Sequence, residues 1–177
     1  LLRTLAVAGI TILLLFWRDT FSHAADEELI AKGEYLFASA GGCGCHTSAG
    51  GALNAGGRPV TTAFGTFYGT NITPDPLHGI GDWTDRQITE ALRSGVGRGG
   101  RALSPVMPYP AFSGMTDADI TALVAYLRSV PAVAQKNVPH EVGIPFQDTM
   151  MWLWRWVFFR SANRKDPEDS YSSNPQW

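Results

Sequence analysis

The feature that most constrains this chain is a cluster of two thiols and an imidazole, Cys43, Cys45 and His46, within four consecutive positions. A cysteine pair that ends in Cys-His is typical of covalent haem attachment. Each thiol can add across a haem vinyl group, and the adjacent imidazole then falls under the iron, for which histidine is a standard proximal ligand. Because the usual spacing is Cys-x-x-Cys-His and this chain has Cys-x-Cys-His, the motif needs support from the rest of the sequence.

Three other interpretations of these residues carry less weight. A disulfide between Cys43 and Cys45 would need strained geometry, because bridged Cα atoms normally lie about 5.5 Å apart with aligned Cβ vectors. A structural zinc site needs four ligands, whereas the chain offers these two cysteines and four histidines that are distant from one another. Two buried structural thiols between glycines are the simplest alternative, but they leave His46 without a role.

The composition fits one loop-rich globular domain together with a membrane-facing part. Of the 177 residues, 45% are hydrophobic and 17% are charged, and the 19 glycines and 11 prolines favour loops and short helices. The net charge of −2 does not suggest a nucleic-acid partner. A haem can fill part of the core of such a domain, so that fewer packed side chains are needed.

The N-terminal residues predict a membrane anchor. Residues 4–17 carry no charge, and Arg3 precedes them. Since a spanning helix needs about 20 apolar residues, this shorter run also fits the hydrophobic region of a signal peptide. We expect residues 1–22 to form an uncleaved transmembrane anchor or signal with Arg3 on the cytoplasmic side, which would place the following domain in a bacterial periplasm.

Three segments have the patterns of amphipathic helices. Residues 25–40 begin with acidic side chains that suit a helix start and contain Gly33 at mid-helix, which suggests the close approach of another helix. Residues 84–95 and 116–130 each begin with a capping residue and have an apolar face. We expect the helix of residues 116–130 to cross the first one, with Tyr126 or Leu123 against Gly33. The capping residues are Thr84, which forms a capping box with Gln87, and Thr116.

A long stretch rich in glycine and proline, residues 47–84, has few helix signals. Long loops inside compact domains are usually functional, and we expect this one to wrap one edge of the haem. Tyr68, Asn71 and Trp83 carry donors that suit the haem propionates. Ordinary turn chemistry explains Asn71 equally well, so both interpretations of this residue stay open.

A proline-stiffened segment, residues 105–110, predicts the distal iron ligand. Its prolines favour an extended loop, which can hold the thioether of Met107 at a fixed place. His/Met ligation is the pattern of cytochromes c, and the alternative role of Met107 is to fill a gap in the core. His78 and His140 are the alternatives for a bis-histidine site, although each fits an exposed loop position better.

Residues 132–177 are predicted to form a linker, a Trp-rich helix over residues 149–160 and a polar tail. The helix contains Trp152, Trp154 and Trp156 and is too short to span a bilayer. Tryptophan-rich segments flanked by arginine suit an amphipathic helix at the membrane interface or a docking surface for another subunit. A core helix fits less well, because the globular domain is already complete before this region.

These motifs together resemble a known family. The stretches GEYLFASAGGCGCHT, FGTFYGTNITPDPLHGIGDWT, SPVMPYPAF and MTDADITALVAYLRSVP are similar to the first haem domain of multihaem cytochrome c subunits from bacterial membrane-bound alcohol, gluconate and fructose dehydrogenases. The resemblance covers roughly residues 27–177. It implies an all-α class I cytochrome c fold over residues 25–131, one covalent haem c, His46 and Met107 as axial ligands, and electron transfer in the periplasm.

The chain departs from the family pattern at the attachment site, where one residue is missing between the cysteines. The residues before the motif align Cys43 with the family's first cysteine, whereas counting back from His46 aligns Gly42 with it. In a helical turn, positions three apart share a face and positions two apart do not. We therefore expect attachment through Cys45, and the sequence leaves open whether Cys43 also forms a thioether.

The sequence thus predicts an electron-transfer protein rather than an enzyme. We expect a membrane-anchored c-type cytochrome in a respiratory or similar redox complex, with the membrane and other subunits as partners through residues 149–160. The irregular cysteine spacing keeps an alternative open, a structural or assembly subunit with a modified or vestigial haem site. A haem sensor or peroxidase is a third interpretation, and it needs an open distal position.

Overall fold

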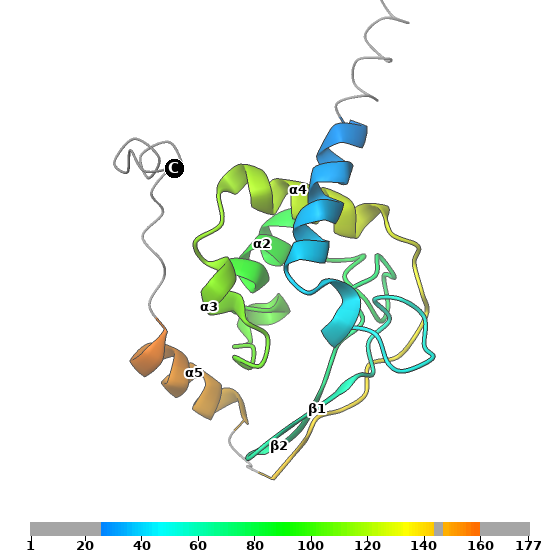
Figure 1. The fold of residues 1–177 in the computed structure, drawn as a ribbon. Coiled ribbons are helices and arrows are strands. Elements are labelled where there is room, and N and C mark those ends of the chain that lie inside the picture. The colour runs from blue at the N-terminus through cyan, green and yellow to red at the C-terminus, as the bar shows by residue number, and fades with distance from the viewer. Residues whose placement is uncertain (1–25, 144–146, 160–177) are drawn as a thin grey trace, which may run out of the picture.

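The computed structural model describes residues 26–143 and 147–159. The predicted anchor of residues 1–22 and the polar tail lie outside the described residues. Figure 1 shows the N-terminal helix crossing α4, with α2 and α3 beside them, a hairpin at the opposite end and α5 along one side. The described helices are residues 26–39, α2 (Asp85–Ser94), α3 (Tyr109–Phe112), α4 (Asp117–Ser129) and α5 (Gln147–Phe158), with short 3₁₀ turns η1 (Gly42–Cys45) and η2 (Arg98–Gly100).

The predicted capping signals begin and end the helices as expected. Thr84 accepts a hydrogen bond from the backbone N–H of Gln87, whose side-chain oxygen accepts one from the Thr84 N–H at 2.9 Å, so the capping box is confirmed. Gly95 ends α2 in the left-handed conformation, with φ 61°. Thr116 caps α4 by accepting a hydrogen bond from the N–H of Asp119 at 3.1 Å. These contacts satisfy backbone groups that helix ends leave without partners.

The helices share one apolar core, and the first helix reaches it through Gly33. A Cβ added at Gly33 would lie 2.0 Å from the carbonyl oxygen of Ala122 and 2.7 Å from the Cβ of Tyr126. The rings of Phe37 and Tyr126 lie 5.2 Å apart beside this crossing. The predicted close approach to Gly33 is therefore confirmed. The buried core residues are Ile80, Ile88, Ile120, Leu123, Val124 and Leu127.

A small antiparallel sheet corrects the all-α prediction. Its strands are β1 (Pro59–Thr62), β2 (Gly65–Tyr68) and β3 (Glu141–Val142), in the order β1-β2-β3. The hairpin forms because its strands contain β-branched and aromatic residues, which suit a pleated half-buried surface. Gly65, with φ 124°, follows the two-residue turn and pairs with Thr62. The fold is mainly helical, with this sheet inside the stretch that we predicted as a loop.

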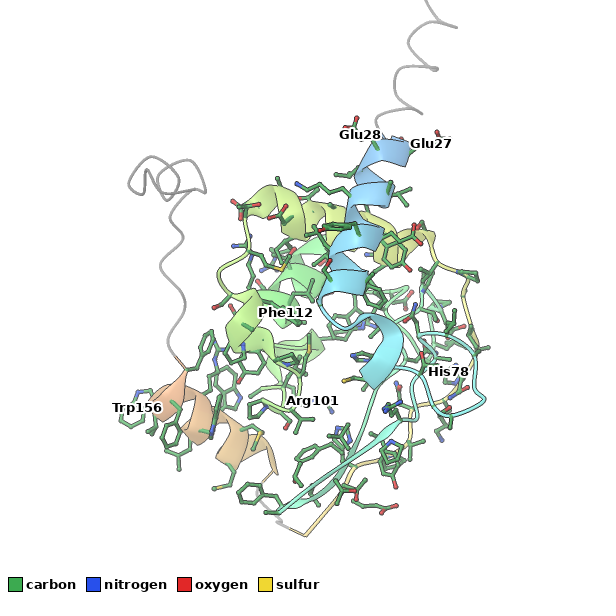
Figure 2. All side chains as sticks on the ribbon, viewed as in Figure 1. Glu27, Glu28, His78, Arg101, Phe112 and Trp156 are labelled. Carbon is green, nitrogen blue, oxygen red and sulfur yellow. The ribbon has the colours of Figure 1, made fainter. Side chains whose placement is uncertain are left out.

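The Trp-rich segment is a helix, and it has two different faces. Trp154 of α5 contacts the buried ring of Tyr109 edge-on, with centroids 6.3 Å apart. Trp156 is 78% exposed and lies on the side of α5 away from the body in Figure 2. The helix predicted over residues 149–160 is thus confirmed, with both ends two residues earlier. Within the described ranges, no helix has the length and apolar character to cross a membrane.

Gly33→Ala should destabilise the protein. The added methyl group would overlap the carbonyl of Ala122, and such overpacking costs about 1–3 kcal/mol, which exceeds the gain of roughly 1 kcal/mol in helix propensity. Thermal unfolding followed by circular dichroism measures the loss. Gly143→Ala is the matched control, because its Cβ would meet nothing within 4 Å. Equal unfolding midpoints for the two variants would contradict the close helix crossing.

Candidate haem site

The imidazole of His46 is held by a backbone carbonyl. Its Nδ1 lies 2.8 Å from the carbonyl oxygen of Thr70. Because a carbonyl oxygen only accepts hydrogen bonds, Nδ1 carries the hydrogen, and Nε2 of the neutral ring keeps its lone pair. Metal-ligating histidines are typically oriented by such a hydrogen bond, which also raises their basicity. His46 therefore has the tautomer that an iron ligand binding through Nε2 requires.

Close backbone packing brings Thr70 to His46. A Cβ at Gly69 would lie 1.8 Å from the carbonyl oxygen of Cys45, so only glycine allows this approach. The N–H of Gly56 donates to the carbonyl oxygen of His46 at 2.7 Å, on the other side of the motif. The chain that leaves β2 is therefore pressed against the Cys-His backbone, and its next carbonyl meets the imidazole.

The surroundings of His46 favour the neutral ring. Burial lowers the pKa of His46 below its ordinary value of 6.5, and the hydrogen bond to Thr70 opposes this shift in part. Burial acts in this direction because it disfavours the charged form. Near neutral pH the ring is therefore deprotonated at Nε2 and able to bind a metal ion.

One thiol of the motif is described, and it is accessible. Cys45 is a free cysteine with an exposed side chain. The side chain of Cys43 lies outside what the structure describes. Gly42, the other position that aligns with the family's first cysteine, has φ 58° and open space where a Cβ would lie. A side chain would fit at Gly42, but L-residues rarely adopt this left-handed backbone conformation.

Met107 lies in a tight turn directly before α3. Its N–H donates to the carbonyl oxygen of Ser104 at 3.1 Å, and its own carbonyl accepts from the N–H of Tyr109 at 2.8 Å. The residue is half-buried. Pro105 and Pro108 stiffen the turn on both sides of the methionine. The extended loop predicted over residues 105–110 is therefore wrong in part, because residues 105–107 form a turn and α3 begins at Tyr109. Iron ligation by Met107 stays a prediction.

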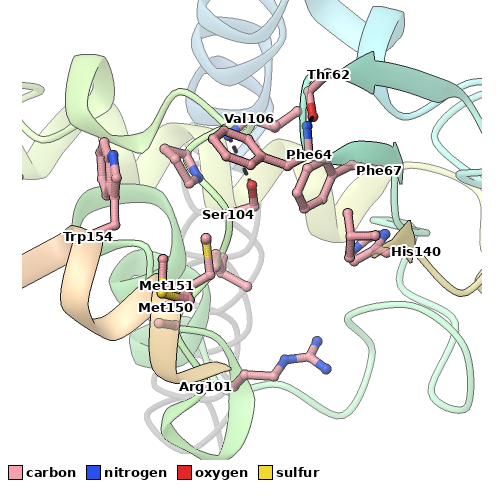
Figure 3. A pocket seen from close by; sticks show the side chains of 14 residues that line it. Thr62, Phe64, Phe67, Arg101, Ser104, Val106, His140, Met150, Met151 and Trp154 are labelled. Atoms are coloured by element: carbon pink, nitrogen blue, oxygen red, sulfur yellow. Dashed lines mark hydrogen bonds between the residues drawn. The ribbon is translucent and has the colours of Figure 1, made fainter. Parts of the chain in front are cut away.

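A cavity of about 410 Å³ lies between the hairpin, residues 101–106 and α5, and its lining includes none of the predicted ligands His46, Cys45 and Met107. The hairpin, whose continuation carries Thr70, forms one wall, and residues 101–106, which lead into Met107, form another (Figure 3). Its volume is typical of small-molecule sites. Its lining is mostly apolar, with Phe64, Phe67, Leu103, Val106, Val142, Met150, Met151 and Trp154, and it also includes Arg101 and His140.

Asn71, one of the predicted propionate donors, bonds within the protein. Its buried amide donates to the carbonyl oxygens of Val133 and Gln135 at 2.8 and 3.0 Å. Its side-chain oxygen accepts from the N–H of Thr73 at 2.9 Å and from the Thr73 hydroxyl at 2.7 Å. Both amide hydrogens are thus engaged. Asn71 links the segment after α4 to the loop. Its amide has no further hydrogen to donate to a haem propionate, and its role there stays a prediction.

The other predicted donors, Tyr68 and Trp83, differ in what they contact. The hydroxyl of Tyr68 donates to the Glu141 carboxylate at 3.0 Å. Trp83 packs partly buried against the core, and its carbonyl oxygen accepts a hydrogen bond from Arg128. Binding of propionates by Tyr68 and Trp83 is untested and stays a prediction.

The two alternative histidine ligands are tied into turns and strands. Asp75 Oδ1 accepts the backbone N–H of His78 at 2.7 Å and lies 3.2 Å from the His78 Nδ1. His140 Nδ1 accepts the backbone N–H of Tyr68 at 3.1 Å. Both rings therefore already make structural hydrogen bonds through Nδ1.

The comparisons with known proteins decide the family. The cytochrome c family model matches residues 30–131. The chain belongs to the cytochrome c family. It is 43% identical over 154 residues to the gluconate 2-dehydrogenase cytochrome c subunit of Pantoea cypripedii, a match that covers 81% of the chain and 34% of the relative.

Two further relatives agree with the predicted resemblance, which is confirmed. The cytochrome c subunit of a quinone-type alcohol dehydrogenase from Gluconobacter oxydans is 38% identical over 87% of the chain and 33% of the relative. The fructose dehydrogenase cytochrome subunit of Gluconobacter japonicus is 41% identical over 75% of the chain and 28% of the relative. The chain spans about a third of the length of these relatives.

A cytochrome c domain implies covalent haem c, and the residues present fit that group. His46 offers Nε2, Cys45 offers a free thiol, and the cavity beside the Met107 turn offers apolar walls. Sequence reasoning missed Thr70, whose contribution is a backbone carbonyl. Gly69 was the available signal, because a glycine between two larger residues can mark a close backbone approach.

Gly69→Ala should loosen the site. The methyl group would collide with the carbonyl of Cys45, so the chain carrying Thr70 must shift and the His46 hydrogen bond must lengthen. We expect a loss of about 1–3 kcal/mol in stability and a lower haem content per chain, measured by thermal unfolding and by absorbance. Gly44→Ala, in the same motif but with open space around its Cβ, should behave as wild type. Equal haem content in the two variants would contradict the claim that the close packing at Gly69 positions the Thr70 carbonyl for haem binding.

Proposed function

We propose that this cytochrome c domain relays single electrons through a covalently bound haem in the cytochrome subunit of a membrane-bound dehydrogenase. The observation that carries the proposal is the orientation of His46 by Thr70, which leaves Nε2 free beside the exposed thiol of Cys45. The relatives named above are cytochrome subunits of gluconate, alcohol and fructose dehydrogenases. The chain spans only part of each relative. Its membership of a dehydrogenase complex, and the substrate of that complex, are therefore proposals.

Each site residue has one task in this proposal. A bound haem supplies the one-electron couple. His46 would bind the iron through Nε2, and the Thr70 carbonyl fixes the plane of the ring and raises its basicity. Cys45 would hold the porphyrin through a thioether, and Met107 would supply a sulfur ligand. The His/Met pair raises the reduction potential.

Such a site carries electrons and does not transform a substrate. If His46 and Met107 both ligate the iron, they would leave no coordination position for a substrate or for peroxide. The dehydrogenase chemistry would then belong to another subunit. The proposal is therefore an electron-transfer protein that works inside an oxidoreductase complex.

The proposed location is the periplasmic face of a bacterial inner membrane. Residues 1–22 supply the anchor in this proposal, on the strength of their apolar run. Helix α5 adds a contact surface, because Trp152 and Trp156 are 44% and 78% exposed while Trp154 packs on Tyr109. Exposed aromatic side chains on a helix suit a membrane interface or another subunit.

The cysteine spacing favours one alternative function. With Cys43 and Cys45 two positions apart, attachment through both thiols requires local distortion, because such positions do not share a helix face. A subunit with a modified or vestigial haem site would then serve assembly or structure. A redox titration that finds no reversible haem couple in a physiological range would favour this alternative over electron transfer.

Intact-mass measurement under denaturing conditions tests the proposal. The wild-type chain should carry the added mass of one haem, and Cys45→Ala should lose it. Cys43→Ala is the matched control and should retain the haem, because the thiol beside His46 is the one that we expect to be bonded. A wild-type chain without haem would reject the proposal. Loss of the haem in Cys43→Ala alone would reject the role of Cys45.

A further inference from the structure

Helix α3, which begins two residues after Met107, is too short to keep its shape without outside contacts. It is a single helical turn, Tyr109–Phe112, and isolated helices shorter than about 12 residues are marginal in water. Within α3, the buried residue is Tyr109, whose side chain is 0% exposed. The packing around the Tyr109 ring therefore fixes the position of this part of the chain.

The Tyr109 ring packs against the end of α2 and against α5. A Cβ added at Gly95, which ends α2, would lie 2.5 Å from ring carbons of Tyr109, so the ring rests directly on this backbone. Trp154 of α5 contacts the ring edge-on, with centroids 6.3 Å apart and an interplanar angle of 88°. Phe159, directly after α5, adds a second edge-on contact at 5.3 Å and 65°. Edge-on contact is a favoured geometry for aromatic pairs.

The hydroxyl group of Tyr109 contributes nothing to this placement. Its oxygen is buried and has no hydrogen-bond partner among the described residues. The contacts of the aromatic ring alone therefore account for the position of Tyr109.

The position of Tyr109 is linked closely to that of Met107. The N–H of Tyr109 donates to the carbonyl oxygen of Met107 at 2.8 Å. Pro108 stands between them, and its ring restricts the backbone, so a displacement of Tyr109 moves Met107 as well. Helix α5 also faces the segment before Met107, because Trp154 and Val106 line the same cavity (Figure 3).

We propose that Trp154 and Phe159 are positioning residues for the distal iron ligand, because they hold Tyr109 and thereby the thioether of Met107. The inference rests on the proposed function, since it needs Met107 as the ligand opposite His46. It gives the inner side of α5 a task in the haem site, separate from any docking by the outer side.

This arrangement has a consequence for the reduction potential. A methionine opposite a histidine raises the potential of a haem. A variant in which Met107 is held less firmly must therefore have a lower potential and a weaker bond between sulfur and iron.

The test uses the full haem-containing chain, a redox titration and the absorption band that a sulfur ligand gives to ferric haem. Trp154→Leu removes the ring but keeps an apolar side chain. It should weaken the band and shift the reduction equilibrium about tenfold toward the ferric form, which corresponds to about 59 mV for one electron. Trp156→Leu is the matched control, because Trp156 is on the same helix and is 78% exposed. It should keep the wild-type band and potential.

Two conservative variants distinguish positioning from a general loss of structure. Trp154→Phe keeps an aromatic ring beside Tyr109, and Tyr109→Phe removes only a hydroxyl without a partner. Both should keep the band and most of the potential. If circular dichroism shows that Trp154→Leu does not fold, Phe159→Leu takes its place, because Phe159 is half-buried and follows the last residue of α5. It should cause a smaller change in the same direction.

The outcomes separate this inference from the proposed function. A wild-type chain without haem overturns both. A wild-type chain with haem but without the sulfur band overturns ligation by Met107 and this inference with it. If wild type has the band and the folded ring-removing variant matches Trp156→Leu in band and potential, only the role of α5 is overturned. Loss of the band in Tyr109→Phe would assign the effect to the hydroxyl and overturn the role of the ring contacts.

Discussion

The hydrogen bond from His46 to the Thr70 carbonyl is the interaction on which the site depends. It selects the tautomer of the imidazole and leaves Nε2 as the free nitrogen. The bond exists because Gly69 lets one stretch of backbone lie against another, with the carbonyl of Cys45 where a Cβ would be. The orientation of the His46 imidazole thus depends on the absence of a side chain at Gly69, a residue that does not itself contact the imidazole in any hydrogen bond among the described residues.

The loop that carries Thr70 is held from its far side by Asn71. The four hydrogen bonds of this one side chain reach Thr73, Val133 and Gln135. Buried polar networks of this kind stiffen a structure when every member is satisfied. The segment after α4 therefore belongs to the framework of the site, and it continues into β3 beside the hairpin.

The helices could be predicted from the sequence because their signals are local. Thr84 with Gln87 and Thr116 specify helix starts within a few residues, and Gly33 marks a crossing that the structure confirms. The hairpin could not be predicted with the same ease. Its segment is rich in glycine and proline, and its third strand comes from more than seventy positions later in the chain. The site was partly predictable for a related reason. His46 and Cys45 carry their chemistry in their side chains, so the motif identified them, whereas Thr70 contributes a backbone carbonyl, which no residue type reveals.

The most direct test of the central claim is nuclear magnetic resonance of the oxidised, haem-loaded chain with ¹⁵N-labelled histidines. Of the four histidines, only His46 should show nitrogen shifts caused by the paramagnetic iron, and its Nδ1–H proton should exchange slowly with water because it is bonded to Thr70. Iron-shifted signals from a second histidine would contradict the ligation by Met107. A shifted histidine without a protected Nδ1–H, or no shifted histidine, would contradict the account of His46.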